Sequence, residues 1–222
     1  MQEGTKKNWV DLTQMNQVMR HRLRNLSCGL TMAIERIQEE VGEDYVQVNS
    51  MAQLMTAELE NLEEMTFRMD LLFDDLPEKT SLSLFELVIK ARQKLLDLYP
   101  HVDLKVSGKE LKLSIHGANL LLIAIHEILV NYAEEKETDL QLYWELENEQ
   151  LALSISGPSK GIPESIPLEP PQPFFTEKGK HDGLGFAIAH RILKSSGGIL
   201  LTRFENGILF FKLVYGEVKV DV

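Results

Sequence analysis

The stretch HEILVN, residues 126–131, decides the fold of the second half of this chain, because it sets polar groups into a strongly apolar segment. The surrounding residues 118–135 are predominantly apolar, which predicts a helix packed in a core. Glu127 and Asn131 are four residues apart and therefore share one face of that helix. Carboxylate and amide oxygens are ligands that Mg²⁺ accepts, so Asn131 is a candidate metal ligand with Glu127 beside it.

Two further stretches follow this helix. SGPSKGIPES, residues 156–165, comes after a predicted strand, and PFFTEKGKHDGLGFAIAHRI, residues 173–192, ends in a predicted helix. Bare backbone N–H groups and the helix dipole can receive phosphate where that helix opens, at Gly183, Leu184 and Gly185. The periodicities predict a layered α/β domain with helices at 84–98, 118–135 and 185–196 and strands at 102–106, 111–115, 140–146, 151–156, 199–204 and 208–214.

The N-terminal part of the chain has a different composition. The first 76 residues contain no proline, and all eight prolines lie from Pro77 onward, so we predict a boundary between domains 1–78 and 79–222. Apolar residues recur there at spacings of three and four, which predicts two long helices, each with one apolar stripe. The stripes consist of Met15, Met19, Leu23, Leu26, Leu30, Ala33, Ile37 and Val41, and of Val48, Met51, Met55, Leu59, Leu62, Met65, Met69, Leu72 and Leu76.

These two helices are joined by a short turn, which makes an antiparallel helical hairpin. A hairpin alone has little against which to bury its stripes, so we expect two copies to pair as a homodimeric four-helix bundle. The expected fold class is α+β: this hairpin, followed by the α/β domain.

His21 lies in the first of these helices, among Arg20, Arg22 and Arg24. At about 100° per residue, its side chain points almost opposite to the apolar stripe. An exposed histidine on a polar helix face is by itself commonly just solvated surface. The neighbouring cations would nevertheless attract a phosphoryl group or an acidic partner surface.

Composition and charge exclude several classes of protein. The net charge of −11 argues against a nucleic-acid partner. The single cysteine, Cys28, permits no intrachain disulfide and fits a reducing compartment. The longest apolar run, residues 120–125, is too short to span a membrane, and the N-terminus lacks the apolar core of a signal peptide. We therefore expect a cytoplasmic protein without a membrane partner.

Together, these stretches resemble the histidine protein kinase family of two-component signalling, over about residues 10–213. RHRLRN, residues 20–25, resembles the family's H box, which implies that His21 accepts the phosphoryl group, with Arg24 and Asn25 as further catalytic residues. The fold implied is a dimerisation and phosphotransfer hairpin followed by a Bergerat-type ATP-binding sandwich. The partner implied is the receiver domain of a response regulator.

The second domain contains the segments that resemble the nucleotide-binding boxes. HEILVNYA resembles the N box, with Asn131 as the Mg²⁺ ligand; PFF with the residues after it resembles the F box; and GLGFAI resembles the last glycine box. The resemblance implies that ATP and Mg²⁺ are held by Glu127, Asn131, Gly161, Thr176, Lys178, Gly183, Leu184 and Gly185.

The chain departs from the family pattern at three positions. Arg22 follows the histidine, where the family usually has an acid that helps to activate the imidazole. Gly157 replaces the aspartate that accepts the adenine amino group, and losing one charged hydrogen-bond partner costs about ten- to a hundredfold in affinity. His181 replaces the first glycine of the last box.

Three functions remain open. In the first, the chain is a kinase, and the γ-phosphoryl group of ATP passes to His21 and then to an aspartate of a response regulator. In the second, the ATP site is degenerate, and His21 takes its phosphoryl group from one receiver domain and gives it to another as an ATP-independent histidine phosphotransferase. In the third, the chain is a dimeric scaffold in which His21 has no role.

Overall fold

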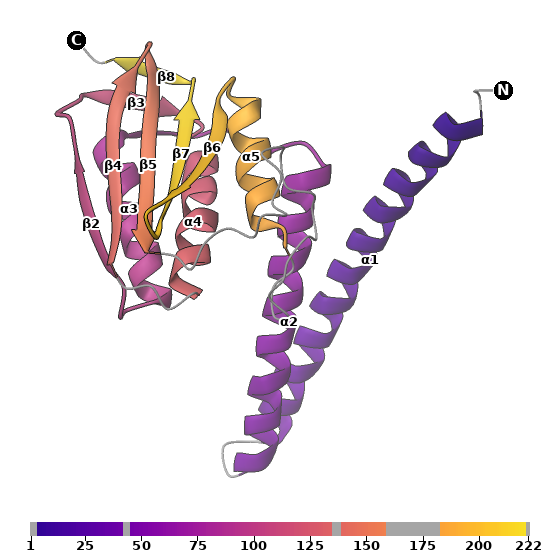
Figure 1. Ribbon diagram of the computed structural model, residues 1–222. Coiled ribbons are helices and arrows are strands. Elements are labelled where there is room, and N and C mark those ends of the chain that lie inside the picture. The colour runs from indigo at the N-terminus through magenta and orange to yellow at the C-terminus, as the bar shows by residue number, and fades with distance from the viewer. Residues whose placement is uncertain (1–3, 42–44, 135–138, 159–182, 221–222) are drawn as a thin grey trace. The chain divides into compact units, whose positions relative to one another are not determined.

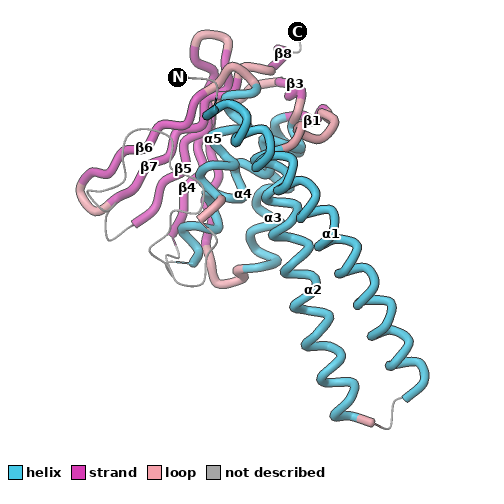
Figure 2. The backbone as a smooth tube through the Cα atoms, turned by 90° about the vertical axis from the view of Figure 1, so that its right-hand side faces the viewer, coloured by secondary structure: helices cyan, strands magenta, loops and turns pink. Residues whose placement is uncertain are grey.

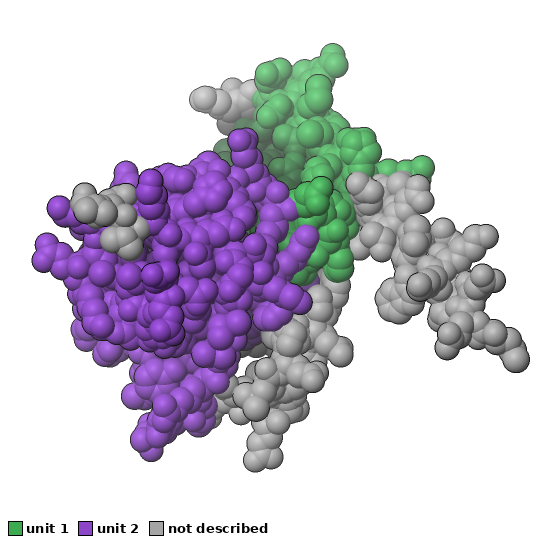
Figure 3. Space-filling model, turned by 90° about the horizontal axis from the view of Figure 1, so that it is seen from above, with its two compact units in different colours: residues 1–75 green, residues 76–222 purple. Residues whose placement is uncertain are grey.

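The computed structural model describes residues 4–41, 45–134, 139–158 and 183–220. The chain divides into two compact units, Met1–Asp75 and Leu76–Val222 (Figure 3). This division lies close to the boundary that the change in composition predicts. Within the described ranges, no helix is both long enough and apolar enough to cross a bilayer.

Unit 1 consists of two helices that run antiparallel, α1 (Gly4–Val41) and α2 (Val46–Phe73) (Figure 1). The buried side chains between them recur every seventh residue, as in a coiled coil. This hairpin seam contains Arg20, Ser27 and Ile34 of α1 and Ala52, Leu59 and Thr66 of α2. The seam is apolar toward the turn, where Ile34, Ala52 and Leu59 cluster, and polar toward the other end.

The two helices bury only part of the predicted apolar stripes. Several stripe residues of the hairpin remain exposed: Met19, Leu26, Leu30, Ile37, Met51, Met55 and Met65. A groove of about 390 Å³ runs along this face, lined by Leu30, Leu54, Met55, Glu58, Leu59 and Leu62. The hairpin therefore presents a large apolar surface that its own packing leaves uncovered.

Unit 2 is a layered α/β sandwich, as the sequence predicts. Its main sheet has the order β2-β4-β5-β7-β6, with β2 and β4 parallel and the other pairs antiparallel. These strands are β2 (Asp103–Gly108), β4 (Asp139–Glu147), β5 (Gln150–Pro158), β6 (Ile199–Glu205) and β7 (Ile208–Tyr215). Three helices lie on one face of this sheet (Figure 2): α3 (Leu84–Leu98), α4 (Ala118–Glu134) and α5 (Gly185–Ser195).

A second, smaller sheet has the order β1-β3-β8 and is antiparallel throughout. Its strands are β1 (Ser81–Ser83), β3 (Leu113–His116) and β8 (Val218–Val220), of which only β3 was predicted. An ion pair of 2.5 Å joins Lys79 to Glu217, and the hydroxyl of Tyr215 donates a 2.7 Å hydrogen bond to the carbonyl of His116. The ion pair ties the start of unit 2 to the residue before β8, and the hydrogen bond ties the end of β7 to the end of β3.

The core of unit 2 lies between α4 and the main sheet. Alternate residues of the central strands point inward and are fully buried, as expected for a sheet with one covered face. The buried residues include Leu140, Leu142, Leu151, Leu153, Ile155 and Leu213 of the strands and Leu121, Ala124, Ile125 and Ile128 of α4. Glu127 and Asn131 are half-buried, so they lie at the edge of this core rather than inside it.

Candidate functional site

His21 is exposed on α1, and its nearest described polar partner is on the same helix. The amide nitrogen of Asn25, one turn later, lies 3.5 Å from His21 Nε2, at the outer limit of a hydrogen bond. An amide N–H that points at this ring nitrogen favours the tautomer in which Nε2 has a lone pair. Asn25 can therefore orient the imidazole, and this hydrogen bond must be released before the Nε2 lone pair can attack a phosphorus atom.

The three arginines around His21 have different environments, contrary to the expectation of one exposed cation cluster. Arg20 is only 2% exposed and lies in the hairpin seam. Its Nε donates to Asp70 Oδ1 at 2.8 Å, and its Nη2 donates to Asp74 Oδ1 at 2.6 Å. Arg24 pairs through Nη2 with the second oxygen of Asp70. Two of the three cations are thus compensated by carboxylates of α2 and of its C-cap residue, Asp74.

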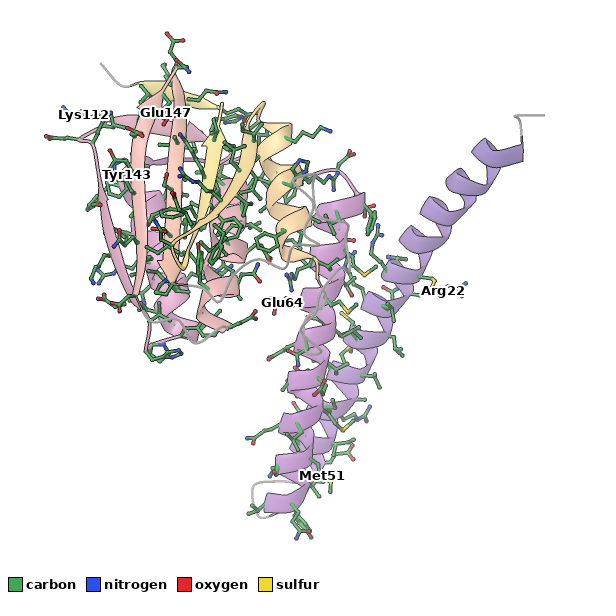
Figure 4. All side chains as sticks on the ribbon, in the orientation of Figure 1. Arg22, Met51, Glu64, Lys112, Tyr143 and Glu147 are labelled. Atoms are coloured by element: carbon green, nitrogen blue, oxygen red, sulfur yellow. The ribbon has the colours of Figure 1, made fainter. Side chains whose placement is uncertain are left out.

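Arg22 is different, because it projects from α1 on the side away from α2 (Figure 4). Among the described residues it forms no ion pair. Its position is two residues after the buried Arg20, which turns it to the opposite side of the helix. Arg22 is thus an exposed cation beside His21, available to an anionic partner.

Sequence reasoning missed Asp70 and Asp74. Both lie in the segment MDLLFDD, residues 69–75, where acidic residues four apart interrupt the apolar stripe of α2. The signal that could have revealed them is the pairing of this acidic face with the arginines of α1 across an antiparallel hairpin. The heptad spacing of Arg20, Ser27 and Ile34 would then have placed Arg20 in the seam.

In unit 2, the predicted nucleotide residues that the structure describes lie on α4 and at the start of α5 or just before it, and these two helices are in contact. Gly183 has a φ of 67°, a left-handed conformation that favours glycine. Leu184 is buried, and α5 begins at Gly185 without a side-chain cap. Gly161, Thr176 and Lys178 lie outside the described residues.

The position of the missing adenine carboxylate, Gly157, is closed by neighbouring side chains. Gly157 is buried on β5, and a Cβ there would lie 2.6 Å from Leu140 Cδ2 and 3.2 Å from Tyr132 Cδ1. The ring of Tyr132 is held by a hydrogen bond from its hydroxyl to the carbonyl of Leu209 and by an edge contact with Phe211 at 5.7 Å. Apolar groups therefore fill the space beside residue 157.

The described residues fit the two ends of a Mg²⁺–ATP site unequally. Glu127 and Asn131 carry the hard oxygen donors that suit Mg²⁺. Within the described ranges, however, no three His, Cys, Asp or Glu side chains form a group that could hold a metal ion. At the position that corresponds to the adenine carboxylate, Gly157 has no side-chain acceptor, and Leu140 and Tyr132 lie where a side chain would extend.

Neither a protein-family model nor a curated protein matches this sequence. Among solved structures, the nucleotide-free catalytic domain of the histidine kinase ThkA is similar, with 20% identity, a TM-score of 0.56, and coverage of 64% of this chain and 97% of that one. ThkA in complex with the response regulator TrrA matches 96% of this chain and 64% of that one, with 16% identity and a TM-score of 0.60. Full-length ShkA in complex with AMPPNP matches 90% of this chain and 47% of that one, with 13% identity and a TM-score of 0.68.

These likenesses agree with the layered sheet, the covering helices and the order of elements described above. At such identities they establish architecture. The chain therefore has the fold of the histidine kinases, including the Bergerat-type α/β sandwich of their ATPase domain.

Proposed function

We propose that this protein is a histidine phosphotransferase of two-component signalling, with His21 as the phosphoryl carrier. The lone pair of His21 Nε2 attacks the phosphorus of a receiver domain's aspartyl phosphate, and the P–O bond to the aspartate breaks. The freed carboxylate leaves with the electron pair of that bond. The reverse step, to an aspartate of another receiver domain, regenerates neutral His21.

The observation that carries this proposal is the exposure of His21 on the face of α1 opposite the uncovered apolar stripe. A partner can reach the imidazole there even when the apolar surface is covered. Asn25 orients the ring, and Arg22 offers an exposed positive charge to a phosphoryl group or to the acidic pocket of a receiver domain. The fold shared with ThkA, whose complex contains a response regulator, supports the class of partner.

Gly157 favours a receiver domain over ATP as the source of the phosphoryl group. Leu140 and Tyr132 occupy the space into which an adenine-binding carboxylate would extend. The competing proposal, a kinase that uses ATP and Mg²⁺ through Glu127 and Asn131, is favoured by the fold shared with ShkA, which was solved with AMPPNP. The two proposals share His21 and differ only in the donor.

The same proposal includes a homodimer. A second hairpin covering the exposed apolar stripes would complete a four-helix bundle, with both copies of His21 on its outside. It also places the chain in the cytoplasm, where its receiver domains would be.

The test compares two donors on the same protein. The wild-type chain and His21→Ala are incubated with a panel of receiver domains charged with radiolabelled acetyl phosphate, and separately with radiolabelled ATP and Mg²⁺. We expect label from at least one receiver domain on the wild-type chain, none on His21→Ala, and none from ATP. Label from ATP on His21 would establish the kinase instead. If neither donor labels the wild-type chain, the remaining function is a dimeric scaffold in which His21 has no role.

A further inference from the structure

The polar end of the hairpin seam lies at the level of His21. Arg20 is buried there and is shared between Asp70 and Asp74. One heptad along α1, the buried hydroxyl of Ser27 donates a 2.8 Å hydrogen bond to Glu63. The seam is therefore held by directional polar contacts near His21 and by apolar packing near the turn.

Among the described residues, Asp70 is the carboxylate that contacts two arginines of α1. Its Oδ1 accepts from Arg20 Nε at 2.8 Å, and its Oδ2 pairs with Arg24 Nη2. Asp70 is 19% exposed, whereas Arg24 is 46% exposed. The carboxylate thus connects a buried arginine to one at the surface.

Arg24 lies between the seam and His21 around the circumference of α1. At about 100° per residue, Arg24 is about 40° from Arg20 and His21 is about 100° from Arg20 in the same sense. Residues three apart on a helix are also neighbours along its surface, so Arg24 adjoins His21. A guanidinium held by Asp70 through one nitrogen still has N–H groups free to donate toward a group on the imidazole.

A gain in stability alone does not explain why the hairpin contains this network of Arg20, Asp70 and Arg24. Replacing a buried ion pair by apolar residues of similar volume is often neutral or stabilising, and the same hairpin already packs Ile34, Ala52 and Leu59 nearer the turn. A buried charge network instead fixes the register and orientation of the helices that share it. Here Arg24 takes part in the network through its contact with Asp70.

We propose that Asp70 is a positioning residue for phosphoryl transfer at His21, acting through Arg24. The Asp70 carboxylate of α2 is held by Arg20 of α1, and it holds the Arg24 guanidinium beside His21, where that guanidinium donates to the phosphoryl oxygens. Charge-assisted hydrogen bonds to phosphate are strong and are best made by a preorganised donor. This inference rests on the proposed function, because it assigns a role in the reaction at His21.

Phosphoramidate tests this inference without a receiver domain. The lone pair of a histidine ring nitrogen attacks the phosphorus, the P–N bond of phosphoramidate breaks, and ammonia leaves with a proton. His101 is exposed on unit 2 and serves as an internal reference in the same molecule. The full-length chain is treated with phosphoramidate and then digested in mild base. Mass spectrometry of the peptides gives the ratio of the phosphorylation rates of His21 and His101.

We expect His21 to react faster than His101 in the wild-type chain. Asp70→Asn should lower the ratio by about tenfold, the size of effect expected when one charge-assisted hydrogen bond is lost. Asp70→Glu, which keeps the carboxylate, should recover part of the loss. Arg24→Gln should match Asp70→Asn, and the double variant should be no slower than either, because both remove the same interaction.

Asp74→Asn is the matched control. It removes a partner of Arg20, as Asp70→Asn does, but leaves the contact between Asp70 and Arg24 in place. We expect it to leave the ratio unchanged, although it weakens the hairpin. An equal loss in both aspartate variants, or no loss in either, would overturn the positioning role. If Asp70→Asn fails to fold, Arg24→Gln decides, since it alters an exposed side chain.

The outcomes also separate this inference from the proposed function. A wild-type His21 that reacts no faster than His101 and takes no label from receiver domains would overturn both. A wild-type His21 that reacts preferentially, with an unchanged ratio in Asp70→Asn and Arg24→Gln, would overturn the role of Asp70 alone.

Discussion

The hydroxyl of Tyr132 is buried in unit 2, where it donates a 2.5 Å hydrogen bond to the carbonyl of Leu209. Removing this hydroxyl leaves the buried carbonyl of Leu209 with one hydrogen bond fewer. We expect Tyr132→Phe to lower the free energy of unfolding by about 1–2 kcal/mol, the usual cost of a lost buried hydrogen bond. Urea unfolding followed by circular dichroism measures this change. Tyr143→Phe is the control, because Tyr143 lies exposed on β4 (Figure 4) and should unfold like the wild type.

At this scale the sequence predicts the exposure of His21 but not the burial of Arg20. The exposure of His21 follows from its angle to the apolar stripe, and α1 places it as expected. The residue type alone does not predict the burial of Arg20, because a long cation belongs on the surface unless a carboxylate compensates it. Asp70 is fifty residues away, and only the pairing of the two helices brings it to Arg20.

At the scale of elements, helix α3 begins with a capping box. The hydroxyl of Ser83 accepts from the backbone N–H of Glu86 at 3.2 Å, and the Glu86 carboxylate accepts from the backbone N–H of Ser83 at 2.9 Å. We expect Ser83→Ala to destabilise unit 2 by about 1 kcal/mol, the typical cost of losing an N-cap. Thermal unfolding measures it, with Ser107→Ala on the exposed part of β2 as the control. Equal melting temperatures for the two variants would contradict it.

The same capping box predicts a pH dependence. The hydroxyl and backbone N–H of Ser83 donate to Glu86 and hold the pKa of its carboxyl below the usual 4.5. Because folding lowers the pKa of Glu86, the capping box contributes its full stabilisation at pH values above the pKa of the unfolded chain. This stabilisation is lost as the pH falls through the pKa of the folded chain. Below pH 4.5, we expect the free energy of unfolding of Glu86→Gln to fall less steeply with decreasing pH than that of the wild type. Acid unfolding of the two proteins is followed in parallel by circular dichroism. Unfolding curves that coincide would contradict this prediction.

Most elements of unit 2 follow from hydrophobic periodicity. The helices begin and end close to their predicted bounds, and the strands of the main sheet extend the predicted segments by one or two residues. The exceptions are β1 and β8, each of three residues. Three residues are too few for an alternating pattern, and both strands exist because β3 pairs with them. Long-range pairing is not visible in a local pattern.

At the scale of the whole molecule, the uncovered apolar stripes of the hairpin predict a homodimer. A stable interface needs a buried apolar centre, and the groove lined by Leu30 and Met55 offers one at the middle of the hairpin. A charge placed there would be buried without a partner in a four-helix bundle. The opposite side of α2 would stay in water, and Gln53 lies exposed on that side.

We therefore expect Met55→Glu to convert a dimer into a monomer, with Gln53→Glu remaining a dimer. The two variants add the same charge two residues apart on one helix, so a general effect of charge or of helix propensity would act on both. Sedimentation equilibrium over a range of protein concentrations gives the masses of both variants and of the wild type. A monomeric wild-type chain, or two variants with equal dissociation constants, would contradict a bundle through this face. Because His21 lies on the opposite side of α1, a Met55→Glu monomer that still reacts at His21 would also separate dimerisation from phosphoryl transfer.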